Sequence, residues 1–132
     1  MTYTFKKAER LGSKALIEKL FKSGRSFTTD PFRVIWLEYS LSTGYPAQIA
    51  FAVPKKNFKR AVDRNKLKRR AREAYRKNKS RLYHHLNTQN RSIILMLVYI
   101  AREPVDQAVI DTKINTIIDR LIKEGGDIGT DN

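Results

Sequence analysis

Closely spaced Lys and Arg side chains are the strongest chemical feature of this sequence. Residues 55–81 hold 14 of the 27 basic residues and only two of the 13 acids. Arginine guanidinium groups match phosphate oxygens in bidentate geometry, and lysine ammonium groups supply compact positive charges. Both release condensed counterions when they bind a polyanion, so such binding weakens with salt. Together with a net charge of +14, the segment predicts a phosphate-rich, polyanionic partner.

The basic segment also has the periodicity of an α-helix, which we expect to run from about Phe58 to Leu82. On a helical wheel at about 100° per residue, its apolar side chains form one narrow buried stripe. This stripe consists of Leu67, Ala71, Ala74 and Tyr75. The opposite face and the flanks hold Asn65, Lys66, Lys68, Arg69, Arg70, Arg72, Arg76 and Lys77. Because Asp63 and Glu73 are the only acids inside this helix, its cations repel one another until an anion approaches.

A solvated surface helix and a membrane-surface helix compete with nucleic-acid binding as interpretations of this segment. Solvated helices are the most common origin of a charge run, but they normally mix both signs for mutual support. A helix lying on a membrane would need a broad apolar face with Trp, Phe or Leu, whereas this stripe is narrow and contains two alanines. No helix-turn-helix pattern or zinc ligand set accompanies the cations, so a standard DNA-reading module is not indicated. We favour nucleic-acid binding, although charge alone does not separate RNA from DNA or from an anionic membrane.

The sequence shows no constellation that could hydrolyse a phosphodiester by itself. Such chemistry generally needs clustered carboxylates that hold metal ions, or a positioned acid and base. Here the carboxylates are scattered, and Asp63 and Glu73 lie ten residues apart on opposite flanks of the basic helix. His84 and His85 fall in an expected polar loop, residues 84–90, where we interpret them as exposed. We therefore predict no catalytic residue, no metal site and no cofactor bound by protein side chains.

Caps, turns and alternation indicate the elements that would position the basic helix. A first helix from about Ser13 to Ser23 would be capped by Ser13 and stopped by Gly24 in the left-handed conformation. The strand Ala47 to Val53 alternates large with small side chains, so one of its faces packs and the other leaves room. Further extended segments are expected at residues 25–28, 32–39 and 92–101, followed by a last helix that Asp106 caps and Gly125-Gly126 ends.

The element order α-β-β-β-α-β-α predicts an α+β fold, a single sandwich with a four-stranded sheet. It would form one domain over residues 1–126, and the polar tail 127–132 would be disordered. The longest apolar run, Ile93 to Ala101, is too short to cross a bilayer, which needs about 20 residues. The N-terminus lacks the apolar core of a secretory signal. A cytoplasmic protein that does not associate with membranes is therefore expected.

The stretch from Phe51 to Glu73 resembles the signature of the bacterial ribonuclease P protein family. In that family a strand ending in paired basic residues precedes a helix with the pattern Ala-Val-x-Arg-Asn-x-x-Lys-Arg-x-x-Arg-Glu. The matching residues here are Ala61, Val62, Arg64, Asn65, Lys68, Arg69, Arg72 and Glu73. Lys66 stands where Arg is common, which keeps the charge but loses the fork. The resemblance extends to the Phe-Lys-x-Gly end of the first helix, at residues 21–24, and covers roughly Phe5 to Glu124.

The resemblance implies a protein subunit of a ribonucleoprotein endonuclease that removes the 5′ leader from precursor tRNA. In such an enzyme the RNA subunit, with Mg²⁺, performs the cleavage. Its partners would be that catalytic RNA and the leader-bearing precursor tRNA, with no obligatory protein partner. The resemblance also implies a left-handed crossover through the basic helix, which is unusual because about 98% of such parallel connections are right-handed.

The resemblance further assigns residues of this domain to two RNA contacts. The RNA-binding residues would be Lys55, Lys56, Lys59, Arg60, Arg64, Asn65, Lys66, Lys68, Arg69, Arg70, Arg72 and Arg76. A cleft between the first helix and the sheet would hold the leader, with Ile17, Phe21, Ile35, Ala52 and Lys56. Ile17 stands where many members place Phe, so one stacking platform would be weaker. Periodicity alone would instead place Phe21 and Ile17 in the core, and Trp36 and Phe51 are expected to be packing residues.

Two other functions share the same composition. A ribosomal-type structural RNA-binding protein would have the charge and the fold size but would need no leader cleft. An autonomous nuclease would cleave without an RNA subunit, which the scattered carboxylates do not favour.

Overall fold

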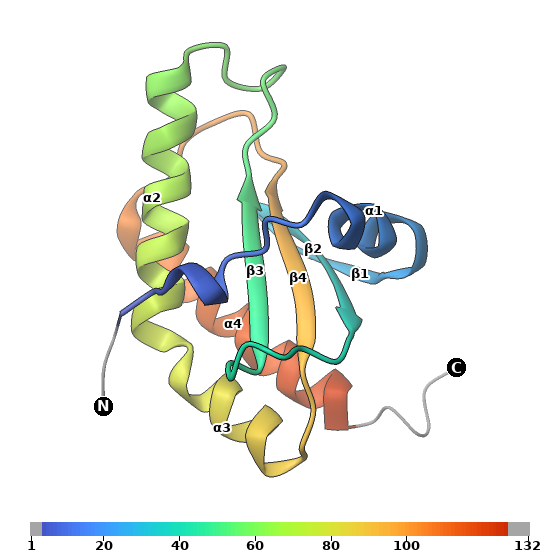
Figure 1. The fold of residues 1–132 in the computed structure, drawn as a ribbon. Helices are drawn as coiled ribbons and strands as arrows, with labels where there is room; N and C mark the ends of the chain where they lie inside the picture. The colour runs from blue at the N-terminus through green and yellow to red at the C-terminus, as the bar shows by residue number, and fades with distance from the viewer. Residues whose placement is uncertain (1–3, 127–132) are drawn as a thin grey trace.

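A four-stranded sheet with helices on both faces organises the chain (Figure 1). The computed structural model describes residues 4–126. Its elements are the 3-10 helix η1 (Lys7–Glu9), α1 (Lys14–Ser23), β1 (Arg25–Thr29), β2 (Phe32–Glu38), β3 (Ala47–Ala52), α2 (Ala61–Asn78), α3 (Ser80–Thr88), β4 (Ile93–Tyr99) and α4 (Gln107–Gly126). The predicted α+β class and four-stranded sheet are confirmed.

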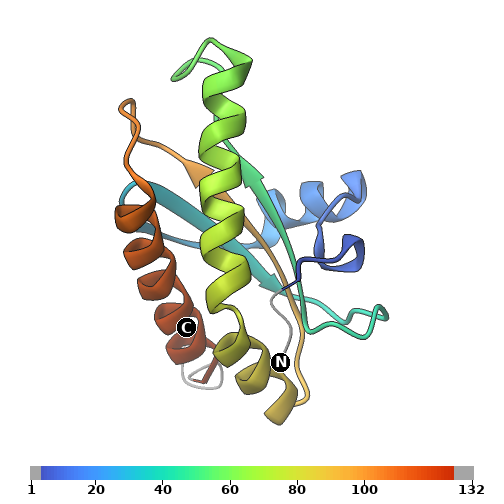
Figure 2. The same cartoon turned by 90° about the vertical axis from the view of Figure 1, so that its left-hand side faces the viewer.

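The strand order is β1-β2-β4-β3, with β4 in the interior and parallel only to β3. The other two pairings are antiparallel. The helices α2 and α4 cover one face of the sheet and α1 covers the other, as Figures 1 and 2 show from two sides. Figure 1 views the sheet from the α1 side with β4 to the right of β3, and α2 packs with α4 against the opposite side, as Figure 2 shows. The crossover from β3 through α2 to β4 is therefore left-handed. The handedness implied by the resemblance is confirmed.

The two faces of the sheet carry cores of very different size. The large core lies under α2 and α4 and includes Trp36, Ile49 and Leu95, whereas the small core under α1 is built on Leu11, Leu20, Ile35, Ile94 and Met96. The strand β3 presents Ile49 and Phe51 to the large core and Ala50 and Ala52 to the small one. The predicted alternation of bulk along this strand is therefore confirmed, as is the packing role of Trp36 and Phe51.

The prediction of a single long basic helix from Phe58 to Leu82 is wrong. The helix α2 ends at Asn78, and a separate helix α3 occupies residues 80–88, so the order gains one helix. The Asn78 side chain donates a hydrogen bond back to the Ala74 carbonyl at 2.8 Å, and such local bonds compete with helix continuation. The polar loop expected around His84 and His85 is also wrong, because Leu82 and Leu86, spaced by four residues, bury one face of α3.

Gly24 ends α1 for a different reason than expected. Its φ of −74° is extended rather than left-handed, so the predicted left-handed stop is wrong. A Cβ atom at this position would lie 2.4 Å from the Leu20 carbonyl oxygen and 3.0 Å from the Ile35 side chain. Close approach of the backbone to its neighbours therefore requires glycine here.

The predicted helix caps are confirmed. Ser13 Oγ accepts a hydrogen bond from Leu16 N at 3.3 Å, and Asp106 Oδ1 accepts one from Val109 N at 3.1 Å. The tail predicted to be disordered, residues 127–132, lies outside the described residues. Among the helices of residues 4–126, none is both long and apolar enough to cross a membrane.

Candidate nucleic-acid interface

The helix α2 packs by the narrow apolar stripe that its sequence predicts. Leu67, Ala71, Ala74 and Tyr75 are each at most 3% exposed. This stripe faces the large core, and α2 lies beside α4 (Figure 2). A stripe this narrow lets most positions of an 18-residue helix carry charge without disturbing the core.

Most of the predicted RNA-binding side chains are not engaged by the protein itself. Within residues 4–126, eight of the twelve form no side-chain hydrogen bond or ion pair: Lys55, Lys56, Lys59, Asn65, Lys66, Lys68, Arg69 and Arg72. A ninth, Arg60, meets Asp63 only at 3.8 Å, with both side chains largely exposed, and such pairs are worth little. The repulsion expected among these cations is therefore unrelieved by the described part of the protein.

Three of the predicted RNA-binding arginines have structural partners. Arg64 donates hydrogen bonds to the carbonyls of Phe58 and Lys59 at 2.8 and 2.9 Å, which ties the loop before α2 to the helix. Arg70 donates to the Val105 carbonyl at 2.6 Å. Arg76 meets the Glu73 carboxylate at 2.5 Å.

The pairing of Arg76 with Glu73 has an electrostatic consequence. The hydrogen bond from Arg76 is the main cause that holds the pKa of the Glu73 carboxyl below its ordinary value. Glu73 is thus ionised at neutral pH and offsets one cation near the C-terminal end of α2.

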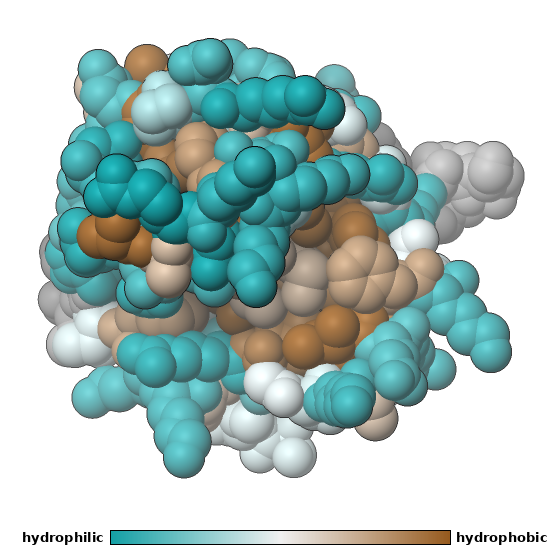
Figure 3. All heavy atoms as spheres, turned by 90° about the horizontal axis from the view of Figure 1, so that it is seen from above, coloured by the Kyte–Doolittle hydropathy of each residue, from teal (hydrophilic) through white to brown (hydrophobic). Residues whose placement is uncertain are grey.

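A hollow of about 440 Å³ opens between α1, the sheet and the loop after β3. It is lined by Phe21, Gly24, Ser26, Arg33, Ile35, Pro54, Lys56, Asn57, Val98, Ile100 and Arg102. This lining combines three cations with apolar surface and includes no carboxylate. Seen from above in Figure 3, apolar residues gather in a depression surrounded by hydrophilic side chains.

Large apolar side chains at the hollow are open to solvent. Phe21 is 58% exposed and Ile100 is 40% exposed, whereas Leu20, the neighbour of Phe21, is fully buried. Successive helix residues point about 100° apart, so α1 buries one side of its apolar stripe and presents the other to the hollow. The core position that periodicity alone would give Phe21 is therefore wrong.

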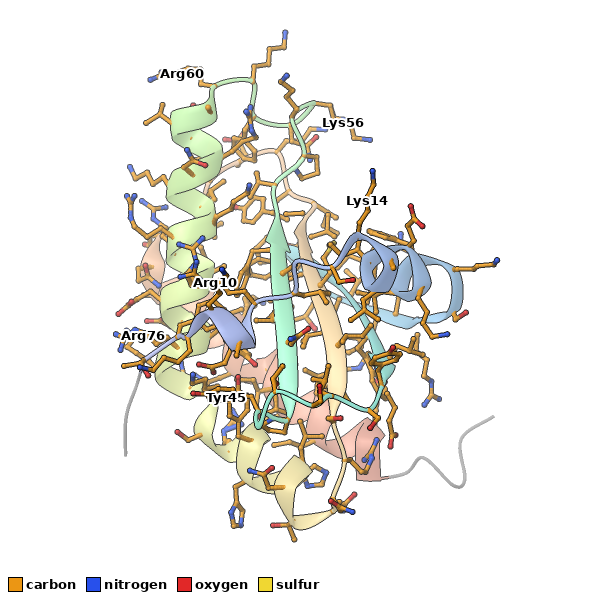
Figure 4. All side chains as sticks on the ribbon, in the orientation of Figure 1. Arg10, Lys14, Tyr45, Lys56, Arg60 and Arg76 are labelled. Atoms are coloured by element: carbon orange, nitrogen blue, oxygen red, sulfur yellow. The ribbon has the colours of Figure 1, made fainter. Side chains whose placement is uncertain are left out.

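The structure brings together three of the five residues predicted for the leader cleft. Phe21, Ile35 and Lys56 line the hollow, and Figure 4 shows Lys56 on the loop above α1. Ile17 and Ala52 do not line it, because both pack at the edge of the small core with Ile35.

Sequence reasoning missed two cations of the hollow, Arg33 and Arg102. Arg33 was signalled by its position as a lone cation inside the apolar strand β2, where the period of two directs it to the α1 face with Ile35. Arg102 lies three residues after the end of the buried strand β4, at the edge where the loop after β3 also lies.

Both histidines lie on α3 and belong to no metal-holding group among the described residues. Across the described residues 4–126, no group of three or more His, Cys, Asp or Glu side chains could hold a metal ion. His84 is exposed on α3, and His85 is half-buried there.

Comparisons with known proteins agree with this geometry. The family model described as Ribonuclease P matches residues 5–122. The ribonuclease P protein component of Porphyromonas gingivalis is 37% identical over 100 residues, which cover 74% of this chain and 70% of that protein. Two solved structures share the fold. The RNase P protein of Thermotoga maritima has a TM-score of 0.67 and 24% identity, and the match covers 85% of this chain and 96% of the other. The RNase P protein of Staphylococcus aureus has a TM-score of 0.67 and 22% identity, and the match covers 87% of this chain and 96% of the other. The chain therefore belongs to the ribonuclease P protein family, whose members are subunits of the endoribonuclease that processes the 5′ leaders of tRNA precursors.

Proposed function

We propose that this subunit divides its surface between two RNAs. The outer face of α2 and the loop before it bind the catalytic RNA subunit, and the hollow beside α1 binds the single-stranded 5′ leader of precursor tRNA. We assign the cleavage itself to the RNA subunit with Mg²⁺, in the bacterial cytoplasm. The observation that carries this proposal is the hollow itself, in which three cations and an exposed Phe21 meet without any carboxylate.

The face of α2 suits the backbone of a folded RNA. Arg69, Arg72 and Lys66 lie on it without partners among the described residues, so they need not break protein contacts before they meet phosphates. Each phosphate contact on a duplex adds about 0.9 to the slope of log affinity against log salt. Binding to the RNA subunit should therefore weaken steeply as salt rises.

The hollow suits an unpaired strand of variable sequence. Arg33, Lys56 and Arg102 offer charge to phosphates, while Phe21 offers a ring face on which any base can stack. Stacking of this kind is worth about 1–3 kcal/mol per base and tolerates all four bases. The protein would thus raise substrate affinity and lower the repulsion between two polyanions without reading a particular leader sequence.

The test is a reconstitution with a bacterial ribonuclease P RNA and two substrates, precursor tRNA with and without its leader, at low Mg²⁺. We expect the chain to stimulate cleavage of the precursor and to raise the affinity of the RNA for the leader-bearing substrate only. No stimulation would overturn the proposal. Cleavage by the chain without the RNA would identify an autonomous nuclease instead.

The same measurement separates a structural RNA-binding protein from a processing subunit. A protein that only supports the fold of its RNA would raise affinity for leader-bearing and leaderless tRNA equally. Dependence on the leader is what the hollow predicts.

A further inference from the structure

The N-terminal segment, residues 4–11, lies along the free edge of the sheet. Leu11 N donates a hydrogen bond to the Ile49 carbonyl at 2.9 Å, and the Gln48 side chain donates one to the Ala8 carbonyl at 3.2 Å. Because β3 is the outer strand of the sheet, this segment covers an edge that would otherwise be open. Figure 1 shows it passing across β3 toward α2.

A buried carboxylate holds this segment to the other helices. Glu9 is fully buried, and Lys79, which contacts it, is only 6% exposed. Glu9 also accepts hydrogen bonds from Lys6 N at 2.7 Å and from the Tyr83 hydroxyl at 2.6 Å. Lys79 in turn donates to the Thr4 carbonyl, so one ammonium group binds two points of the segment.

Lys79 stands at the junction of two helices. It follows the last residue of α2 and precedes the first residue of α3. The contact with Glu9 therefore joins the N-terminal segment to the point where the chain leaves the basic helix. A buried ion pair is often no more stabilising than an apolar pair of the same size, and its best-attested use is to select one geometry. That makes the placement of the segment, rather than stability alone, the property to explain.

The segment carries cations that this placement sets beside α2. Lys6, Lys7 and Arg10 are exposed and form no ion pair with the described carboxylates. The Arg10 guanidinium lies over the Phe5 ring, 5.4 Å from its centroid, and that ring packs edge-on against Tyr75 of α2 at 6.0 Å. Figure 4 shows Arg10 reaching toward α2, with Arg76 further along that helix.

We propose that Glu9 is a positioning residue for RNA binding, which through Lys79 fixes the N-terminal segment so that Lys6, Lys7 and Arg10 extend the cationic face of α2. This inference rests on the proposed function, since it needs an RNA subunit bound to that face. Glu9 is fully buried, so it would affect RNA binding without contacting the RNA.

The direction in which Glu9→Gln changes RNA affinity tests the proposal. The variant removes a negative charge, so charge alone would make RNA bind more tightly. Loss of positioning predicts the opposite: affinity for ribonuclease P RNA about ten-fold weaker and a salt slope lower by about two, as expected when two or three phosphate contacts are lost. Glu18→Gln, on the exposed surface of α1, is the matched control and should leave affinity unchanged or slightly higher.

A second variant removes the cations without touching the buried pair. Replacing Lys6, Lys7 and Arg10 together by Ala changes only exposed side chains, so the fold is kept. It should weaken RNA binding as much as Glu9→Gln does. In that triple background, Glu9→Gln should have no further effect, because the groups it positions are gone. Full affinity in the triple variant, or an undiminished effect of Glu9→Gln in it, would overturn the proposal.

The controls also separate this inference from the proposed function. Arg72→Ala, on α2, tests the docking face itself. If Arg72→Ala weakens RNA binding while the Glu9 and N-terminal variants do not, the positioning role alone is wrong. If none of them changes affinity, the docking face is wrong. Hydrogen exchange provides an independent measure: Glu9→Gln should speed exchange at Leu11 N while leaving the interior of β4 protected.

Discussion

The Lys and Arg side chains at the two ends of the basic segment, residues 55–81, differ in whether they are paired with carboxylates. From residue 76 onward, every cation of the region meets a carboxylate: Arg76 with Glu73, Lys77 with Asp111, Lys79 with Glu9 and Arg81 with Asp119. Before Glu73, seven Lys and Arg side chains have no partner among residues 4–126. The cations of the C-terminal end are thus tied into the fold, while most cations of the N-terminal end have no partner among the described residues.

This difference shows that cation density by itself does not predict which Lys and Arg side chains stay unpaired. What distinguishes the two ends is the position of acids elsewhere in the chain. Asp111 and Asp119 come from α4, and Glu9 comes from η1, near the start of the chain. Substitution of the paired cations should therefore change stability, and substitution of the unpaired cations should change RNA affinity while stability stays constant.

The largest effect is expected where the pairing is most buried. Lys79→Met keeps the length of the side chain but leaves the Glu9 carboxylate buried without its cation, which should cost roughly 3–5 kcal/mol of unfolding free energy. Urea denaturation at pH 7 measures it. Lys22→Met, on the exposed face of α1, is the control and should change stability by less than about 0.5 kcal/mol. An equally small change for Lys79→Met would contradict the paired-end interpretation.

The pH dependence of this effect follows from Glu9. Burial acts to raise the pKa of the Glu9 carboxyl, but the hydrogen bonds from Lys6 N, Lys79 and Tyr83 together outweigh it, so the folded pKa lies below the ordinary value. A lowered pKa contributes stability that is present above the unfolded value of about 4.3 and is lost as pH falls through the folded value. In Lys79→Met the ammonium group no longer offsets burial, so the pKa of Glu9 is raised. The stability difference between wild type and Lys79→Met should therefore be largest at pH 7 and shrink as pH falls from the raised pKa of the variant to the lowered pKa of the wild type.

At the unpaired end, the double variant Arg69→Ala with Arg72→Ala should act on RNA alone. We expect affinity for the RNA subunit to fall roughly ten-fold for each arginine, since hydrogen bonds to charged groups contribute about 1.5–3 kcal/mol. The salt slope should fall by about two. The matched control removes two α4 cations, Lys113→Ala with Lys123→Ala, with the same change in net charge. Equal losses in the two double variants would mean that overall charge, and not the α2 face, controls binding.

Features of the basic segment that depend on neighbouring residues could be predicted from the sequence, and those that depend on residues far along the chain could not. The buried stripe of α2 was predictable because Leu67, Ala71, Ala74 and Tyr75 follow one local period. The pairing of Lys79 was not, because its partner Glu9 is 70 residues away and only the fold brings the two together. The bond from Arg70 to the Val105 carbonyl is likewise long-range, at 35 residues, whereas Arg64 bonds the Phe58 carbonyl only six residues away. RNA binding by both arginines stays a prediction.

Short local patterns also gave wrong predictions for α3 and for Phe21. The helix α3 offers only Leu82 and Leu86 as fully buried apolar positions, and the polar residues between them resemble a loop. The exposure of Phe21 was outside the reach of periodicity, since the pattern of α1 does not say where the sheet beneath it ends. The family resemblance supplied the prediction of a cleft, and Arg33 and Arg102 line the hollow that the structure has at this place.

A smaller effect is expected for Phe21→Ala, which tests whether the hollow is separate from the docking face. Loss of a stacking platform should reduce the affinity for leader-bearing substrate about ten-fold, within the range of about 1–3 kcal/mol per base. Affinity for the RNA subunit should be unchanged, because Phe21 lies on α1 and not on α2. Val109→Ala, another exposed apolar position, controls for loss of apolar surface. Equal losses for substrate and RNA subunit, with a lowered urea midpoint, would assign Phe21 to stability instead.

The smallest effects are expected for Lys77→Ala and Lys66→Ala, which test where the paired end begins. Lys77 and Lys66 lie along the same flank of α2, but Lys77 Nζ is 3.5 Å from the Asp111 carboxylate and Lys66 has no partner among the described residues. An exposed pair of this kind contributes less than about 1 kcal/mol, so Lys77→Ala should lower stability slightly and change RNA affinity less than two-fold. Lys66→Ala should leave stability unchanged and lower the salt slope by about one. If both variants weaken RNA binding alike, the acids of α4 do not set the limit of the interface, and the RNA extends past Glu73 along the whole flank.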